Sequence, residues 1–599
     1  MDQSIGRLRW LRVPAVLTAI GLLAAACGNT TGGTTPSSAT GTKGGTLTML
    51  GTGDVDHLDP ASAYYTVSFQ IIRGYSRQLV TYPTSSDPNA STSIVADMAT
   101  QVPSTSNGGI SADGLTYTFK IKSGVKWDTT PARQVTAADF VLGFKRLCNP
   151  VNPVGAPAYY ESTIVGFKDY CEPMLAGGST LAAINAYISG HDISGITTSG
   201  TDTIKFTLTQ PAGDFLNILA LPFASPAPQE YLQYVPGDDT FNQHVISDGP
   251  YKIVKYDPAK ELDMDRNPAW DASTDSVRAA YVDHIKVTMG LTQDAVQQQI
   301  AAGTGDMEWD VVPPTADLAQ MLQATPRDPR LVIGTPSSIN PYIVFNLQSP
   351  NAGGAMANLK VRQALEYVVD KVAIAQFIGG LSINKAAHQV LWAGNAGYQP
   401  FNLYPTPGDK GDPAKAKSLL AAAGYPNGLT LNYVYRTAGN GPKYAASYQA
   451  NFAAAGVTLK LVPVPSAQFY TKYLESADAS KRGVWDIAAP GWIPDWFGNN
   501  GRSVIQPLFD GRTYGPGTTD YGDYNSSATN AAIDAALAAK SLADANKYWH
   551  QADLQIMQDA AIIPVLNQQT PLYHSARVQN FVFFPFFQQG DPSNVWLKP

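Results

Sequence analysis

One acidic residue stands between two tryptophans in a segment where Gly and Pro interrupt regular structure. Residues 491–496 read Gly-Trp-Ile-Pro-Asp-Trp and follow a short apolar run at 485–488. The run predicts a strand, and the Gly and Pro predict a loop past its carboxyl end, where open α/β sheets bind ligands. Asp495 has no basic residue nearer in sequence than Arg502. Because an unpaired buried carboxylate is costly, we expect either a ligand's cationic group beside Asp495 or an exposed loop in which water solvates it.

The residue types that carry most enzyme chemistry do not form recognisable motifs. The sequence holds no HExxH, GxSxG, P-loop or GxGxxG pattern. One SxxK pattern occurs at Ser123–Lys126, a spacing with which lysine activates serine in penicillin-recognising enzymes, but it falls in a turn and lacks companion motifs. No Cys/His cluster suggests a metal. An enzyme interpretation therefore has no positive support in these motifs, and we expect no cofactor and no metal; an exported hydrolase stays as the alternative from the enzyme class.

Composition argues against nucleic acid as a partner. The net charge is −7, and no block of basic residues occurs in the 599-residue chain. A chain of this length is too long for one hydrophobic core, so it predicts two to four domains. The 30 tyrosines and 10 tryptophans suit ligand-lining surfaces as well as cores, because their rings are large and amphipathic.

The first residues carry an export signal. Three arginines precede an apolar run at 13–26, which is too short for a comfortable transmembrane helix. Small residues then lead into Cys27, and the pattern resembles a bacterial lipobox, although Ala24 stands where the commonest form has Leu. We expect a lipoprotein signal peptide over 1–27 with Cys27 lipidated, a plain secretory signal being the alternative. Residues 28–43 are rich in Gly, Thr and Ser and predict a flexible tether.

Lipidation of Cys27 leaves an even pair of cysteines, Cys148 and Cys171. In an oxidising compartment such a pair predicts a disulfide. The bond would stabilise the fold by roughly 3 kcal/mol in the chain-entropy description. Two buried free thiols are the alternative.

Periodicity predicts several elements in the first half of the chain. Residues 44–50 read as a short strand, and residues 115–121 and 204–208 alternate apolar with polar side chains, as half-buried strands do. Thr136 and Asp139 have the spacing of a variant capping box at the start of a helix. The apolar stripe of that helix consists of Phe140, Phe144 and Leu147.

The second half reads as helices alternating with strands. Asn358 is placed to cap a helix, and Asp412 is placed to cap the next one, with Pro413 in its first turn and Gly424 beyond its end. The apolar face expected for the first of these helices consists of Val361, Leu365, Val368, Val369 and Val372. Strand-like runs at 428–435 and 457–464 flank a helical pattern at 442–455, which predicts a βαβ unit.

One long run is similar to a known family signature. Residues 114–147, GLTYTFKIKSGVKWDTTPARQVTAADFVLGFKRL, resemble the signature segment of the extracellular solute-binding protein family 5, the oligopeptide-, dipeptide- and nickel-type receptors of ABC importers. Further segments follow in the family's order: 247–257, 266–271, 342–350, 358–374, 411–428, 453–462, the Trp485 loop and 559–565. So many ordered matches over most of the chain form a more specific signal than a single short motif.

The resemblance implies an α/β, two-lobed, periplasmic-binding-protein-like fold of type II, with an extra inserted subdomain in lobe I and a ligand cleft between the lobes. Carried over, lobe I covers 44–83, 211–338 and 563–599, the inserted subdomain covers 84–210, and lobe II covers 339–562. The chain then crosses between the lobes near 337–338 and 562–563.

The resemblance also implies roles for the loop residues. In peptide-binding relatives the acid of the WxxD loop holds the ligand's α-ammonium, which corresponds here to Asp495. Gly491 and Ile493 then offer backbone hydrogen bonds to an extended ligand, and Trp492 and Trp496 wall the pocket. The sequence departs from the family's usual DP-type pair after the acid, since Trp496 and then Phe497 follow it. That bulk predicts a narrower or more aromatic pocket.

Three further residues are candidates on weaker grounds. Arg436 lies in the region where dipeptide-type relatives carry an arginine for the ligand's carboxylate, and an ordinary solvated arginine is the alternative. Tyr159 and Tyr160, from the inserted subdomain, are placed to cover the cleft, and plain core packing is the alternative.

The function implied by these features is that of an extracellular receptor. We expect a monomer, anchored by lipid to the outer face of the cytoplasmic membrane, that captures peptides by hinge closure and delivers them to an ABC permease. A receptor of the same class for a nickel chelate or an oligosaccharide is the alternative within the family.

Overall fold

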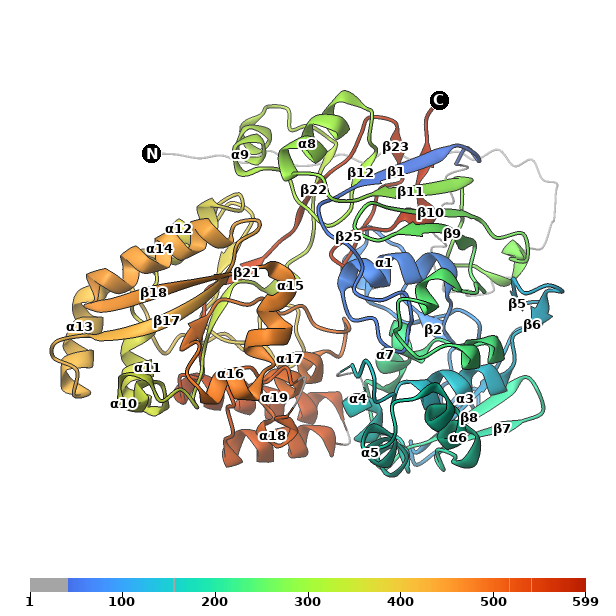
Figure 1. Ribbon diagram of the computed structural model, residues 1–599, viewed down its shortest axis with the longest axis horizontal. Helices are drawn as coiled ribbons and strands as arrows, with labels where there is room; N and C mark the ends of the chain where they lie inside the picture. Colours follow the sequence, from blue (N-terminus) through green and yellow to red (C-terminus); the bar gives the residue numbers. More distant parts are fainter. Residues whose placement is uncertain (1–40, 155–156, 516–517, 540) are drawn as a thin grey trace, which may run out of the picture. The chain divides into compact units, whose positions relative to one another are not determined.

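Two five-stranded mixed sheets organise the computed structural model, which describes residues 41–154, 157–515, 518–539 and 541–599 (Figure 1). The strand orders are β12-β1-β11-β10-β9 in the first sheet and β18-β17-β19-β15-β20 in the second. The predicted signal peptide, Cys27 and most of the tether lie outside the described residues. Within the described ranges, no helix combines the length and the apolar character that a bilayer span requires.

The first sheet is built from the start of the chain and from a segment more than 200 residues later. β1 (Thr46–Leu50) pairs in parallel with β11 (His284–Thr288) and β12 (Met307–Glu308). β10 (Glu261–Arg266) pairs antiparallel with β11 and with β9 (Tyr251–Asp257). The strand predicted at 44–50 is confirmed. The loop after β1 leads into α1 (Thr66–Tyr75), whose residues from Ser68 onward are buried.

An antiparallel sheet and a group of short helices follow as an excursion from this first sheet. β4 (Thr116–Lys120), β8 (Thr203–Thr207) and β7 (Ile196–Ser199) form the sheet. The predicted alternation is confirmed, since Tyr117 and Phe119 on β4 are buried while Thr118 and Lys120 are exposed. The helices are α3 (Ala137–Arg146), α4 (Pro157–Glu161), α5 (Phe167–Leu175), α6 (Leu181–Gly190) and α7 (Phe215–Leu219).

The start of α3 and the disulfide both agree with the sequence. The Asp139 carboxylate accepts hydrogen bonds from the backbone N–H of Thr136 at 2.8 Å and from its hydroxyl at 3.0 Å, so the predicted cap forms. Cys148, just past α3, is joined to Cys171 in α5 by a disulfide, with Cα atoms 5.0 Å apart. The bond therefore ties together two of the helices that pack against the antiparallel sheet.

The second sheet contains the predicted βαβ unit. β17 (Leu429–Arg436) and β18 (Val457–Val464) are parallel, and α14 (Gly441–Ala454) connects and packs against both, as the orange segment of Figure 1 shows. β19 (Ile487–Ala488) is parallel to β17, so the predicted apolar run forms a shorter strand than its length suggested. β15 (Tyr342–Phe345) is antiparallel to β19 and to β20 (Ile562–Pro564).

Both faces of the second sheet are covered. On β15, Ile343 and Phe345 belong to a hydrophobic cluster shared with α11 (Leu359–Leu365), α12 (Lys371–Gln376), α13 (Pro413–Ala422) and α14. Tyr342 and Val344 belong to a second cluster, shared with α17 (Gly501–Phe509), α18 (Ser527–Leu537) and α19 (Leu542–Gln558). Successive side chains of a strand point to opposite faces, so the sheet carries one helical layer on each side.

One predicted helix is divided in two. Asn358 caps α11 as expected, with its side chain accepting from the N–H of Lys360. The helix ends at Leu365 instead of continuing to Val372, and α12 starts only at Lys371, capped by Asp370. The apolar spacing of the valines was therefore misread as one continuous helix. The break lets Val368 and Val369 stay buried in an irregular segment.

Two pairs of short strands lie where the chain passes from one five-stranded sheet to the other and back. β13 (Leu331–Ile333) pairs with β22 (Pro571–Tyr573), and β14 (Ser338–Ile339) pairs with β21 (Leu566–Gln568). The outgoing and returning segments thus run side by side. They include the predicted crossing at 337–338 and follow closely on the one at 562–563. The exact lobe limits stay a prediction.

Candidate functional site

The loop that follows β19 is attached by its backbone to β14. The N–H of Trp492 donates to the carbonyl of Ile339 at 2.8 Å, and the N–H of Ile339 donates back to Trp492 at 3.0 Å. A Cβ atom on Gly491 would lie 2.5 Å from the Asn340 side chain, so this close approach requires glycine. Because backbone polar groups alternate along an extended strand, those of Gly491 and Ile493 face away from β14.

Asp495 is held by two tyrosines from distant parts of the chain. The Tyr64 hydroxyl donates to both carboxylate oxygens, at 3.0 and 3.2 Å. The Tyr159 hydroxyl donates to Oδ2 of the same carboxylate. Burial removes hydration from the carboxylate and raises the pKa of Asp495 to about 7, although both hydrogen bonds act in the opposite direction. The group therefore changes its charge near neutral pH.

This carboxylate has no cationic partner in the described part of the chain. Arg502, the nearest basic residue in sequence, turns away and lies 3.4 Å from an oxygen of Asp214. The surroundings of Asp495 are aromatic hydroxyls and rings. A positive charge brought in by a ligand would complete the site, since it would offset the cost of burying the carboxylate.

The two tryptophans around Asp495 belong to different hydrophobic clusters. Trp492 packs with residues of β15 and α17, and its indole N–H donates to the carbonyl of Ser503 at 2.8 Å. Trp496 is fully buried in the cluster of the first sheet and meets Tyr159 edge to face, with ring centroids 4.9 Å apart. The loop thus contacts two bodies of hydrophobic core, the first body around the first five-stranded sheet and the second body around the second. Asp495 lies in the loop between these two contacts.

A third contact ties the end of this loop to the first sheet's side of the molecule. The carbonyl of Phe497 accepts a hydrogen bond from the Tyr82 hydroxyl at 2.9 Å and another from the Asn217 amide at 3.0 Å. Asn217 also donates to the Tyr82 hydroxyl. All of these groups are buried, so the contact holds the end of the loop in place.

The remaining predicted residues fall in different places. Tyr159 lies in the site, but Tyr160 lies in the core. The Tyr160 ring is fully buried, with the rings of Phe144 and Phe167 centred 5.4 and 5.5 Å away, and its hydroxyl donates to a backbone carbonyl. Arg436 ends β17, and its guanidinium lies 5.1 Å from the ring centroid of Phe469.

Two site residues escaped the sequence reasoning. Tyr64 lies before α1, and only the preceding loop marked that region as irregular. Glu475 follows the π-helix Phe469–Leu474. Burial, the Asp495 carboxylate and, to a smaller extent, the charge of Glu475 raise the pKa of Tyr64. Burial raises the pKa of Glu475 itself to about 7. Nothing in the local sequence distinguished this glutamate from a surface residue.

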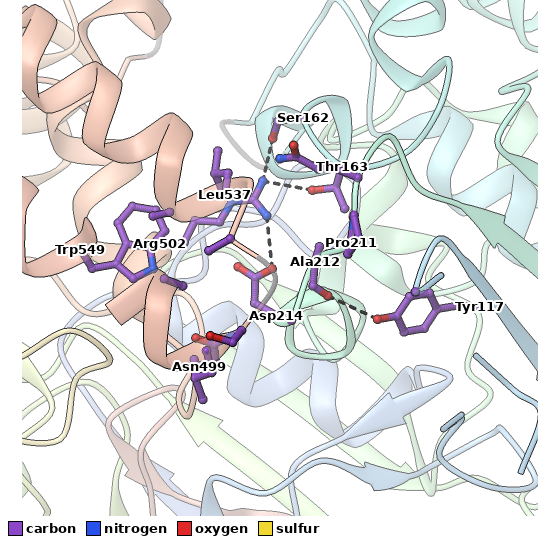
Figure 2. A pocket seen from close by; sticks show the side chains of 18 residues that line it. Tyr117, Ser162, Thr163, Pro211, Ala212, Asp214, Asn499, Arg502, Leu537 and Trp549 are labelled. Atoms are coloured by element: carbon purple, nitrogen blue, oxygen red, sulfur yellow. Dashed lines mark hydrogen bonds and ion pairs between the residues drawn. The ribbon is translucent and has the colours of Figure 1, made fainter. Parts of the chain in front are cut away.

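A cavity of about 180 Å³, drawn in Figure 2, is lined by Arg502 and its neighbours and not by Asp495. Its walls are the segment 210–214 on one side and residues of α17, α18 and α19 on the other. Arg502 forms part of the wall, as does Asp214. Neither Ser123 nor Lys126 borders it, and both are exposed, so the SxxK pattern forms no enclosed site. Within the described ranges, no three acidic, His or Cys side chains gather to hold a metal.

Comparison with known proteins gives a family and relatives of similar length. Residues 93–515 match the family described as bacterial extracellular solute-binding proteins, family 5. Heme-binding protein A of Haemophilus influenzae is 28% identical over 497 residues, which cover 80% of each chain. The dipeptide-binding protein of Escherichia coli is 27% identical over 405 residues, covering 64% of this chain and 66% of the relative.

A solved structure extends the likeness to the fold. The clavulanic acid biosynthesis oligopeptide binding protein 2 superposes with a TM-score of 0.80 at 24% identity, over 93% of this chain and 96% of that one. The two-lobed α/β fold of type II binding proteins, expected from the sequence, is therefore confirmed. Because the family match covers most of the chain, this chain belongs to the bacterial extracellular solute-binding proteins of family 5.

Proposed function

We propose that this protein is a lipid-anchored receptor on the outer face of the cytoplasmic membrane that captures peptides and delivers them to an ABC permease. The observation that carries the proposal is Asp495, a carboxylate removed from water, held by two tyrosine hydroxyls and without a cationic partner in the described chain. A peptide's α-ammonium supplies that partner. A charge-assisted hydrogen bond in such a place is stronger than one in water.

The neighbouring backbone suits an extended ligand. Gly491 and Ile493 would pair with the peptide main chain as a neighbouring strand does, a mode that gives affinity without reading side chains. Trp492 and Trp496 would limit the space on either side of the anchor. Arg436, whose guanidinium lies against the rings of Phe469 and Tyr470, would take the ligand's carboxylate.

Closure would work through the paired segments around β14 and β21. Lobe I would comprise 44–83, 211–338 and 563–599, with the inserted subdomain at 84–210, and lobe II would comprise 339–562. Tyr64 and Tyr159 belong to the first body and Asp495 to the second, so the anchor is complete only when the two are together. A ligand that binds this arrangement shifts the population toward it, and the permease would recognise the closed form.

Other solutes are less well matched to the anchor. One relative is named a heme-binding protein, but heme carries carboxylates and no ammonium, and so would not neutralise Asp495. An oligosaccharide would stack on the aromatic rings and would leave the same carboxylate unpaired. A nickel chelate would neutralise Asp495 only if the chelate as a whole carried a net positive charge.

Mass spectrometry of ligands that co-purify with the protein tests the proposal. Peptides released on denaturation, and their loss from an Asp495→Asn preparation, are the expected result. Release of heme, a sugar or a metal chelate instead, with no peptide, would overturn the ligand assignment and leave the family unchanged. The anchor is tested separately: Cys27→Ser should move the protein from the membrane fraction to the soluble one. Light scattering should give the mass of a monomer.

A further inference from the structure

Arg502 is a buried cation with an unusually complete set of acceptors. It is the second residue of α17, on the side of the second sheet, and it is only 2% exposed. Its guanidinium reaches the turn just after α4, where it donates to the Ser162 hydroxyl at 2.7 Å and the Thr163 hydroxyl at 3.1 Å. Figure 2 shows these bonds together with the ion pair to Asp214.

The same side chain is prevented from swinging elsewhere. Its Nε donates to Gln506, one turn further along α17, at 2.7 Å. Its Nη2 also donates to the carbonyl of Tyr159 at 3.2 Å. The planar fork of a guanidinium lets Nε, Nη1 and Nη2 reach these acceptors together, with the two N–H groups of Nη2 shared among three oxygens, whereas the ammonium of lysine has only three donors.

Tyr159 is therefore held at both ends. Its carbonyl accepts a hydrogen bond from Arg502, and its hydroxyl donates one to Asp495. Asp495 precedes Arg502 by seven residues in the chain. Between these two hydrogen bonds the ring of Tyr159 meets Trp496 edge to face and lies beneath the guanidinium, 5.6 Å from the ring centroid. The position of the Tyr159 hydroxyl thus depends on where Arg502 holds α4.

We infer that Arg502 is a positioning residue of the ligand anchor: it docks α4 against α17 so that the hydroxyl of Tyr159 reaches the carboxylate of Asp495. The inference rests on the proposed function and deepens it, because it names a residue that acts on the anchor without touching the ligand. Arg502 comes from α17 and Asp214 from the segment before α7, and Figure 2 draws the ion pair that joins them, so this contact needs the two bodies to be together.

If Arg502 positions Tyr159, loss of the Arg502 side chain should raise the pKa of Asp495. The titratable and charged groups that interact electrostatically with Asp495 or with its two hydroxyl donors include the core residue Tyr160 from the first body and Glu475, Tyr521 and Arg502 from the second. The hydrogen bond from Tyr159 favours the ionised carboxylate. Removing Arg502 should weaken that bond, so ligand binding should need a higher pH, whereas a mere loss of packing would weaken binding equally at every pH.

The experiment is a calorimetric pH series with trialanine as the probe. Arg502→Gln and Tyr159→Phe should each move the midpoint of the acid limb of binding upward by about half a pH unit. The double variant should move it no further than either single one, because both act through one hydrogen bond. Arg512→Gln is the matched control, since the ion pairs of Arg512 are made with Asp510 and Asp534, both on its own side of the molecule.

Each outcome decides between the two claims. A weaker affinity for Arg502→Gln with an unmoved midpoint, or shifts that add in the double variant, would overturn the positioning role and leave peptide binding intact. No trialanine binding by the wild-type protein would count against the proposed function and the inference together. If Arg502→Gln does not fold, Arg502→Lys and Asp214→Asn replace it, and each should give a smaller upward shift of the same midpoint.

Discussion

Tyr64 and Asp495 lie 431 residues apart in the chain, yet the Tyr64 hydroxyl donates to both oxygens of the Asp495 carboxylate, at 3.0 and 3.2 Å. Tyr64 comes from the segment between β1 and α1, and Asp495 comes from the loop after β19. The hydrogen bonds therefore join the side of the first sheet to the side of the second. Under the proposed function, a ligand bound to this carboxylate would meet groups from both bodies at once.

Asp495→Asn should weaken binding of trialanine by at least tenfold, about 1.4 kcal/mol. The substitution keeps the shape of the side chain and removes the charge that the ligand's ammonium meets. Titration calorimetry measures the change. Asp239→Asn, at an exposed aspartate, is the control and should bind as the wild type does.

N-acetylation of the probe tests the same contact from the ligand's side. The acetylated peptide should lose as much affinity for the wild-type protein as the free peptide loses for Asp495→Asn, and should bind the two proteins nearly equally. Undiminished affinity in both experiments would exclude the amine anchor.

Binding of trialanine should weaken below neutral pH. Burial raises the pKa of Asp495 to about 7 in the free protein, and a bound ammonium would lower it again. The free protein thus takes up a proton, below that pH, that the complex does not hold. Affinity should fall with each pH unit below 7 and be greatest above 7, until the ligand's own amine loses its proton near pH ~8.

Glu475→Gln provides the control for this pH dependence, because burial also raises the pKa of Glu475 to about 7. The acid limb should persist in Glu475→Gln and disappear in Asp495→Asn. If the acid limb disappeared only in Glu475→Gln, the titrating group would be Glu475 and not Asp495, and the mechanism would be contradicted.

Trp496→Ala should speed the release of bound trialanine and lower the melting temperature. The indole is fully buried and meets Tyr159 edge to face, so its removal leaves a cavity beside the anchor, and such truncations cost about 3–5 kcal/mol. Trp496→Phe keeps a ring there and loses only the bond from the indole N–H to Asn499. Stopped-flow dissociation should rank the wild type slowest, Phe next and Ala fastest.

Cleavage of the disulfide between Cys148 and Cys171 should destabilise the protein by roughly 3 kcal/mol, because the bond closes a loop of 23 residues in the chain-entropy description. Urea unfolding of Cys148→Ser/Cys171→Ser against the wild type measures it. Equal unfolding midpoints with and without reductant, in a protein with no free thiols before reduction, would contradict this expectation.

The sequence determined by itself the features that depend on neighbours in the chain. The alternation in β4 and β8, the cap at Thr136, the βαβ unit around α14 and the Gly/Pro break after β19 are all local, because side-chain periodicity and backbone restrictions act over a few residues. The same reasoning misread α11 and α12 as one helix, since a loop buried among apolar residues has the same spacing as a helical face.

Only the tertiary structure decided which groups surround Asp495. Tyr64 and Tyr159 come from separate segments. The sequence offered Tyr159 and Tyr160 alike as candidates to cover the cleft, and no local pattern distinguished Tyr64 from other tyrosines in the chain. Tyr159 faces the anchor while its neighbour Tyr160 is in the core, because adjacent residues on α4 point in different directions. Arg502 is the basic residue nearest to Asp495 in sequence, but it pairs with Asp214. A buried guanidinium needs acceptors for its N–H groups, and the tertiary fold decides where those acceptors lie.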